Sequence, residues 1–256
     1  MFLMGCQSLD VNLPAPRIES PESVGMKKFI IGGTVTGAGK FRATSNAGER
    51  PPNLTDTALA GALNVGPVGE YGITDHLSTG LEIDIGGANS SIFGQGRIKY
   101  QLMGSTWTKK ETGPQLSIWV RGGSGSGSEE GNQKVEFGSG GYPWTGTITD
   151  TMIGSGISFG YRTSERTLLY TGFAADKHSL KAEINQSAAT DNSDPGGTYS
   201  RTYSGKASAL GLGVRFSWRI FALDIYSTYN TATFDDTAKA TGVSGGIKFE
   251  WLLNAK

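Results

Sequence analysis

Hydrophobic and polar residues alternate along most of this 256-residue chain, and turn-rich gaps interrupt the alternation. A period of two residues is typical of a β-strand that has one apolar face. No segment shows the period of 3.6 residues that an amphipathic helix would have. The pattern predicts ten strands, at about 28–39, 56–72, 77–86, 92–103, 115–122, 147–162, 167–184, 205–218, 220–231 and 239–252.

The gaps between the predicted strands alternate in length. Gaps after odd-numbered strands are mostly long and polar, whereas three of the four after even-numbered strands are short, at 74–76, 163–166 and near Arg219. Transmembrane β-barrels have this asymmetry, with short periplasmic turns and longer external loops. An even number of strands places both termini on the periplasmic side. The stretch 122–131, which has linker composition, is predicted to lie in an external loop.

The strand predicted at 205–218 shows how its two faces differ. Apolar and other residues alternate there as Leu210, Gly211, Leu212, Gly213, Val214, Arg215, Phe216, Ser217 and Trp218. In this and the other strands the second face is rich in Gly, Ala and Ser, which suit a crowded barrel interior and are a poor choice for a solvated face. Strands of about ten residues also suit a tilted membrane crossing. The apolar face is therefore predicted to point outward, toward lipid.

Aromatic residues gather at both ends of the predicted strands, as expected of the two interfacial girdles of a membrane barrel. The predicted periplasmic girdle comprises Tyr71, Tyr100, Tyr161, Trp218 and Trp251. The predicted external girdle comprises Phe93, Tyr142, Trp144, Tyr203 and Tyr229.

The last predicted strand carries a more specific pattern. In residues 244–251, Ser244, Gly246, Phe249 and Trp251 follow the spacing polar, any, Gly, any, any, aromatic, any, aromatic. This spacing resembles the C-terminal signal by which the barrel-assembly machinery recognises bacterial outer-membrane β-barrels. The resemblance implies an all-β, antiparallel, up-and-down transmembrane barrel of about ten strands over residues 28–256, in the outer membrane of a Gram-negative cell. Outer-membrane lipid and the assembly machinery are the implied partners.

Composition agrees with this fold and narrows the function. The chain has 23 basic and 23 acidic residues, so it lacks the basic excess of a nucleic-acid-binding protein. Hydrophobic residues make up 37% of the chain, and no apolar run approaches the roughly 18 residues of a membrane helix. A soluble periplasmic or secreted β-barrel or sandwich that binds an apolar ligand remains the alternative, because its strands would also alternate.

The only cysteine, Cys6, lies in the sequence Leu3–Met4–Gly5–Cys6, which resembles the lipobox of bacterial lipoproteins. That resemblance implies lipidation of Cys6, although the residues before it lack the basic and apolar regions of a signal peptide. Residues 1–27, with Pro14, Pro16 and Pro21, are predicted to form a lipobox-like start and an extended periplasmic linker.

Charged residues on the predicted inner face suggest what the barrel encloses. The candidate lumen charges are Glu82, Asp84, Arg97, Lys99, Arg121, Arg215, Asp224, Lys248 and Glu250. Opposite charges on neighbouring strands, such as Glu82 and Arg97, can pair across the barrel wall. The set is interpreted as a salt-bridged plug, and the alternative is the selectivity lining of a small, porin-like channel. A ten-stranded barrel is only slightly wider than an eight-stranded one, which side chains fill.

Catalytic chemistry has little support in the sequence. His178 and Ser179 are adjacent and so point to opposite faces of a strand, which disfavours a Ser–His pair. An outer-membrane hydrolase is therefore the weakest alternative, and no cofactor or metal site is expected. A structural or surface-interaction barrel or a small pore is the predicted function, and the sequence does not identify the solute or surface partner.

Overall fold

The computed structural model describes residues 6–46, 53–86, 91–134, 141–187, 197–235 and 238–253, and its secondary structure in these ranges consists of strands and turns. The strands are β1 (Cys6–Pro14), β2 (Phe29–Asn46), β3 (Asn53–Gly72), β4 (Leu77–Gly86), β5 (Ile92–Met103), β6 (Gly113–Lys134), β7 (Gly141–Arg162), β8 (Thr167–Gln186), β9 (Gly197–Ser217), β10 (Phe221–Phe234) and β11 (Ala238–Leu253).

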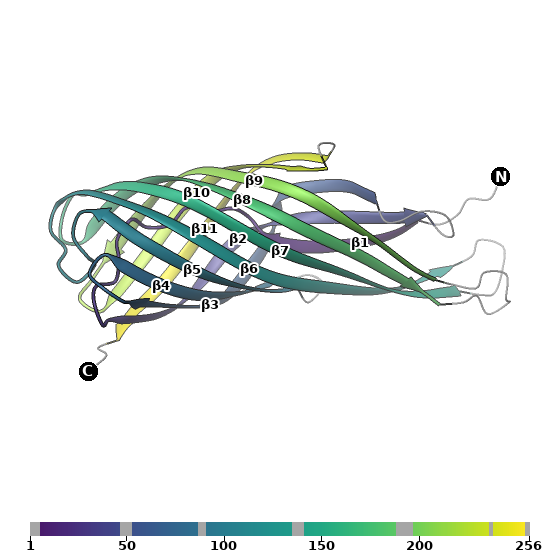
Figure 1. Cartoon of the computed structure of the whole chain (residues 1–256), viewed down its shortest axis with the longest axis horizontal. Helices are drawn as coiled ribbons and strands as arrows, with labels where there is room; N and C mark the ends of the chain where they lie inside the picture. The colour runs from purple at the N-terminus through teal and green to yellow at the C-terminus, as the bar shows by residue number, and fades with distance from the viewer. Residues whose placement is uncertain are drawn as a thin grey trace.

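Strands β2 to β11 form a closed antiparallel barrel (Figure 1). Each strand pairs with its neighbour in the chain, and β2 pairs with both β3 and β11, which closes the ring. The predicted ten-stranded up-and-down barrel is therefore confirmed. No helix in the described ranges is long and apolar enough to cross a membrane.

Several strands continue farther toward the external end than the sequence predicted. The Gly- and Ser-rich stretch 122–131 belongs to β6, and its partners run from Ile153 to Trp144 on β7. The prediction of an external loop there is wrong. Ladder hydrogen bonds come from the backbone, so a strand of Gly and Ser forms when both neighbours hold it in register.

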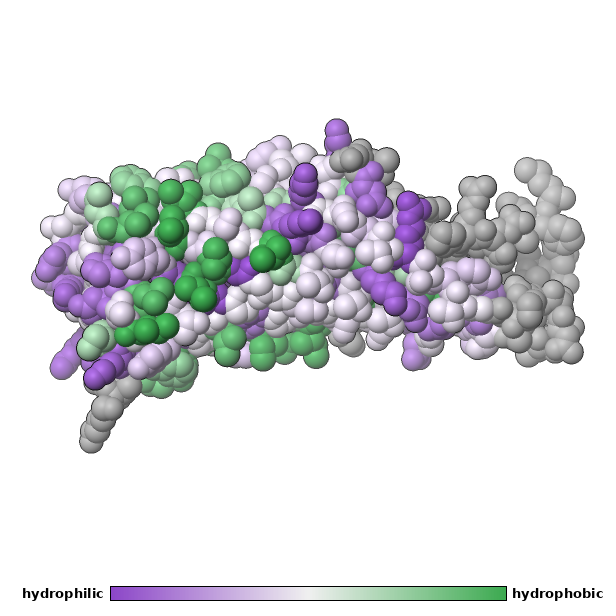
Figure 2. Space-filling model, in the orientation of Figure 1, coloured by the Kyte–Doolittle hydropathy of each residue, from purple (hydrophilic) through white to green (hydrophobic). Residues whose placement is uncertain are grey.

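The orientation of the apolar face is confirmed in the half of the barrel that carries the short turns. Leu212 is 71% exposed and Phe249 is 38% exposed on the outer wall, whereas Arg215 is buried inside. Figure 2 shows hydrophobic residues concentrated over this half, while the other half is mostly weakly or strongly hydrophilic. We call the first half the membrane zone and the second half the external zone.

The two aromatic girdles have different outcomes. All five residues of the periplasmic girdle are exposed on the outer wall, as predicted. In the external girdle only Tyr229 is exposed: Phe93, Trp144 and Tyr203 are buried and face inward, and the side chain of Tyr142 lies outside the described residues. The external girdle is therefore wrong as predicted, because apolar side chains turn into the barrel in the external zone.

The interior of the external zone is an apolar core. One cluster of buried residues there comprises Ile148, Leu180, Ala182, Tyr203, Ala207, Ala232, Phe234 and Ala240. On the outer wall of the same zone, β7 presents Thr145, Thr147, Thr149 and Thr151. The external zone thus has the polarity of a water-soluble barrel.

The N-terminal part of the chain runs through the barrel. Strand β1 pairs with the external half of β2, where Cys6 lies opposite Asn46, and residues 15–25 are then buried before β2 begins at Phe29. Since Leu253 pairs with Phe29, Cys6 and Leu253 lie at opposite ends of the barrel. The sequence predicted that residues 1–27 include an extended periplasmic linker, whereas residues 15–25 are buried inside the barrel. It also predicted that both termini lie on the periplasmic side, whereas Cys6 and Leu253 lie at opposite ends.

Candidate functional site: the plugged lumen

Residues 15–25 form an extended segment inside the membrane zone, which we call the plug segment. Its composition explains why it can lie there without its own secondary structure. Pro16 and Pro21 fix an extended backbone and bring no N–H group that would need a partner. The charged side chains of the segment are Arg17, Glu19 and Glu22, and the barrel wall supplies partners for each.

Arg17 and Glu19, in the half of the plug segment that follows β1, are held by ion pairs with the barrel wall. Arg17 donates two hydrogen bonds to the two carboxylate oxygens of Glu82 on β4, one of them 2.6 Å long between Nη1 and Oε1. Glu19 pairs with Arg97 on β5, and its carboxylate is 3.9 Å from Lys248 Nζ on β11. Bidentate arginine–carboxylate pairs fix both distance and orientation. The segment is therefore tied to three strands around the ring.

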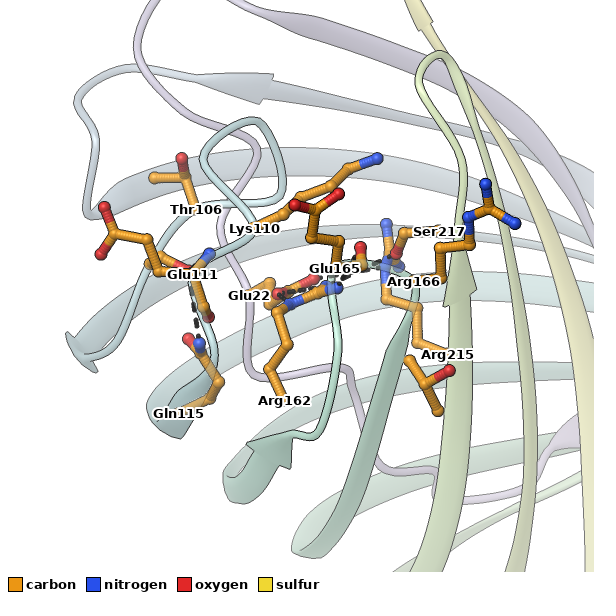
Figure 3. Close-up of polar contacts among 12 residues, drawn as sticks. Glu22, Thr106, Lys110, Glu111, Gln115, Arg162, Glu165, Arg166, Arg215 and Ser217 are labelled. Carbon is orange, nitrogen blue, oxygen red and sulfur yellow. Dashed lines mark hydrogen bonds and ion pairs between the residues drawn. The ribbon is translucent and has the colours of Figure 1, made fainter.

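Glu22 holds the half of the plug segment that is nearer the periplasmic end of the barrel. Arg162 of β7 donates from Nε to Glu22 Oε1 at 2.6 Å, and Arg215 Nε of β9 lies 3.6 Å from Oε2. Figure 3 shows the Glu22 and Arg162 side chains facing each other, with Arg215 and Ser217 nearby at the ends of the strands. Because all these groups are buried, the pairs are shielded from solvent screening.

Glycines in the wall make room for the one large apolar side chain of the plug segment. Ile18 lies against Gly172 of β8 and Gly211 of β9, which are paired across the two strands. A Cβ atom on Gly172 would lie 3.0 Å from Ile18 Cγ2, and one on Gly211 would lie 3.1 Å from Ile18 Cδ1. The small inner-face residues that the sequence analysis assigned to a tight interior therefore contact the plug segment.

The periplasmic end of the lumen is closed by the 104–112 turn. The Ser23 N–H donates to Gln101 Oε1 at 2.9 Å, and the Trp107 N–H donates to the Ser23 carbonyl at 3.0 Å. The buried Trp107 ring packs with Val24, and the Arg215 guanidinium lies 4.8 Å from its centroid, in cation–π contact.

Asp75, in the neighbouring periplasmic turn, fastens the end of the plug segment. Its carboxylate accepts hydrogen bonds from the Met26 backbone N–H at 3.1 Å and from Lys109 Nζ at 3.2 Å. These two interactions hold the pKa of the Asp75 carboxyl below its ordinary value.

The predicted lumen charges all face the interior. Eight are buried and the ninth, Lys248, is partly buried; the buried set is Glu82, Asp84, Arg97, Lys99, Arg121, Arg215, Asp224 and Glu250. Some contact one another, since Glu250 is 2.7 Å from both Arg215 and Lys248.

Other predicted contacts are replaced by contacts with residues that sequence reasoning missed. Glu82 pairs with Arg17 of the plug segment, and Arg97 and Lys99 pair with Glu70 at 2.6 and 3.0 Å. Glu82 lies opposite Gln95 in the register, so Arg97 is out of line with it. Glu70 occupies an inward-facing position in the alternation of its strand, and this position is the sequence signal that could have identified it as a lumen charge.

Little space remains between the plug segment and the wall. Three voids lie around Arg17, Glu19, Glu22 and their partners, each of about 10 Å³. A void of this size holds about one water molecule. These three spaces beside the plug segment are therefore no larger than about one water molecule each.

A closed barrel with a mainly apolar outer wall and paired charges inside pairs its strand backbone around the ring while it presents a largely apolar surface to lipid. The chain is a transmembrane β-barrel of the outer-membrane type. Its short turns mark the periplasmic side and its long strands extend outward. The residues of the resembled assembly signal lie in β11, the strand that closes the ring on β2. Their recognition by the assembly machinery stays a prediction.

Comparisons with known proteins find similar solved structures at low sequence identity. No protein-family model and no curated protein matches the sequence. The outer membrane protease OmpT from Escherichia coli has 10% sequence identity and a TM-score of 0.45, with 91% of this chain and 99% of that chain covered. Ail, the attachment invasion locus protein of Yersinia pestis, has 14% identity and a TM-score of 0.32, with coverages of 90% and 100%. The monoaromatic hydrocarbon channel CymD has 8% identity, a TM-score of 0.32, and coverages of 90% and 90%.

His178 contributes to the wall of the barrel. Its Nδ1 lies 2.9 Å from Asp150 Oδ2, both residues are buried, and its ring contacts Phe234. Ser179 points to the outer wall, so the two side chains are on opposite faces as the sequence predicted. Sequence reasoning missed Asp150 as the partner of His178.

Proposed function

We propose that this protein is a sealed outer-membrane barrel, which acts as a structural and surface-interaction element and does not serve as an open pore. The observation that carries the proposal is the plug segment, whose Arg17 and Glu22 are buried and paired with wall residues from different strands. A charged segment held in this way resists displacement, because each broken pair leaves a buried charge without a partner.

The external zone provides the surface. Beyond the apolar band, strands β7 to β9 continue with an apolar core and an outer wall of Thr, Lys and Glu residues. A packed core makes this part stiff, which suits a surface that holds its shape for contact with another molecule. A hydrolase is not favoured, since the buried His178 is 3% exposed and a substrate could not reach it.

Conductance across planar bilayers tests the seal. The wild-type protein should give no stepwise currents. The double substitution Arg17→Gln and Glu22→Gln keeps a polar side chain at both positions but removes both charges, and should give frequent transient openings. Deletion of residues 6–24 should give long-lived channels. The outward-facing Lys181→Gln substitution is the matched control and should stay silent.

Heat-modifiable gel mobility shows in each case whether the barrel has folded. Sustained wild-type channels would show that the protein is a pore. A folded deletion variant that remains silent would show that something other than the plug segment closes the lumen.

The lipid tether at Cys6 is part of the same proposal. Cys6 lies opposite Asn46, at the end of β2 away from the short turns, so a lipid on Cys6 would attach at the external end. Cells grown with an alkyne-labelled fatty acid should yield labelled protein, and Cys6→Ser should abolish the label. Equal labelling of the variant would show that Cys6 does not carry the lipid, and would leave the proposal of a sealed lumen unchanged.

A further inference from the structure

Two lysines face each other on the outer wall at the boundary of the membrane and external zones. Lys177 of β8 and Lys206 of β9 are direct partners in the strand register, and both are exposed on the outer wall. Like charges directly opposite each other on neighbouring strands are destabilising. A bound anion between them would turn this repulsion into attraction.

Acidic residues near the pair are engaged elsewhere. Asp176 points inward and pairs with Arg121 at 2.5 Å, and Asp235 lies 3.9 Å from Arg201. Within the described ranges, neither Lys177 nor Lys206 forms an ion pair. Among the residues that the structure describes, these two neighbouring positive charges therefore have no acidic counter-ion.

A groove of about 620 Å³ on the outer wall is bordered by the two lysines. The residues one step closer to the membrane on β7, β8 and β9 are Ser155, Ala175 and Ser208, all with small side chains. Larger apolar residues continue the wall farther into the membrane zone, at Ile157, Phe173 and Leu210. The row of small side chains thus hollows the wall directly between the lysines and the apolar band.

The height of the pair matches the lipid headgroups. From Leu169 at the periplasmic end of β8 to Lys177 there are eight residue steps, or about 26 Å along a strand. A strand tilt near 45° reduces this to about 19 Å, which is about 6 Å below the top of an apolar band roughly 25 Å high, and an extended lysine side chain spans that remaining distance. The ammonium groups therefore lie where the outer leaflet has its polar groups.

We propose that Lys177 and Lys206 bind the phosphate of a phosphorylated lipid in the outer leaflet, and that the groove below them holds one of its acyl chains. Two ammonium groups match a phosphate in charge, and small wall residues admit a chain that a flat wall would exclude. The site is on the outer wall, so it is independent of the plug segment and of the sealed lumen.

Native mass spectrometry of the full-length protein in non-ionic detergent tests the site. The probe is an acylated glucosamine disaccharide that carries two phosphates, compared with the same lipid without phosphates. The double substitution Lys177→Gln and Lys206→Gln should weaken binding of the phosphorylated lipid at least tenfold and leave the dephosphorylated lipid unaffected. Lys181→Gln, on the same strand and outer face, is the matched control, because Lys181 is paired with Glu183 at 3.0 Å.

A third variant tests the groove. Ala175→Phe should fill the groove and weaken binding of the phosphorylated lipid several-fold, although both lysines remain. Inorganic phosphate at the same concentration should fail to displace the lipid. Equal affinity for the two lipids, or an equal loss in Lys181→Gln, would overturn the phosphate site. Full binding by a folded Ala175→Phe variant, or displacement by inorganic phosphate, would overturn the acyl groove.

Discussion

The membrane zone and the external zone are built from the same strands but have opposite polarity. In the membrane zone, β7 points Ile157 and Phe159 outward and Gly156 and Ser158 inward. In the external zone, the same strand points Thr149 outward and Ile148 inward. Since inner and outer positions alternate without interruption, the apolar residues change face while the backbone continues unchanged.

This difference teaches that the solvent outside, rather than the strand, decides which face is apolar. Where lipid surrounds the barrel, charges must be enclosed and paired, and the plug segment with the wall residues meets that need. Where water surrounds it, the interior fills with side chains such as Leu180, Tyr203 and Phe234. The two arrangements that the sequence posed as alternatives, an apolar exterior and an apolar interior, follow each other along one axis.

The largest expected effect comes from the apolar core of the external zone. Phe234→Ala should lower the free energy of unfolding by about 3–5 kcal/mol, because the ring is 1% exposed and its removal leaves a cavity. Phe173→Ala, on the lipid-facing wall, should cost less than half as much, since lipid replaces the lost contacts. Reversible guanidinium unfolding in vesicles measures both. Equal losses would show that the two zones do not differ in this way.

A charge on the outer wall gives the next largest effect. Leu212→Arg should destabilise the barrel by about 2–4 kcal/mol, because it places a cation among acyl chains near the middle of the band. Thr149→Arg should change stability by less than about 0.5 kcal/mol, because that position is wet. The same unfolding measurement compares them. If Thr149→Arg is the more harmful, the zone boundary is misplaced.

The smallest expected effect lies at the periplasmic turn and depends on pH. Because the pKa of Asp75 is lowered in the folded state, its contribution is present above the ordinary carboxyl pKa of about 3.9 and is lost as the pH falls through the folded-state value. The Asp75 side chain is 45% exposed, so solvent screens the interaction and this contribution should be below about 1 kcal/mol. The stability difference between wild type and Asp75→Asn should shrink from pH 6 to pH 3. A constant difference would contradict the role of this carboxylate.

The membrane zone could be predicted from sequence because its signal is local. Alternation of Leu212 and Phe216 with Gly213 and Arg215 identifies both faces of β9 without knowledge of any other strand. The change of face in β7 is also present in the sequence. Ile148 and Ile153 are five positions apart, an odd number, so their side chains point to opposite faces of the strand. This change of face could not be interpreted from the sequence, because the side on which an apolar residue should lie depends on whether lipid or water surrounds that part of the strand.

The plug segment could not be predicted from local pattern. Two prolines and mixed charges give it the composition of a linker, and it has no period. Its partners are also remote: Glu22 and Arg162 are 140 positions apart in the chain. Only closure of the ring brings the wall charges around residues 15–25, so neither their burial nor their pairing can be derived from neighbours in sequence.

The enclosed plug segment also leads to an expectation about the order of assembly. The ring closes where β11 meets β2 through eight register pairs, from Gly246 with Thr36 to Leu253 with Phe29, whereas β6 and β7 share twenty-two. Arg17 and Glu22 pair with wall residues on β4, β7 and β9, and these pairs can form only when those strands surround residues 15–25. We therefore expect the wall to close around residues 15–25, so that the pairing of the last strand with the first encloses them in the folded molecule.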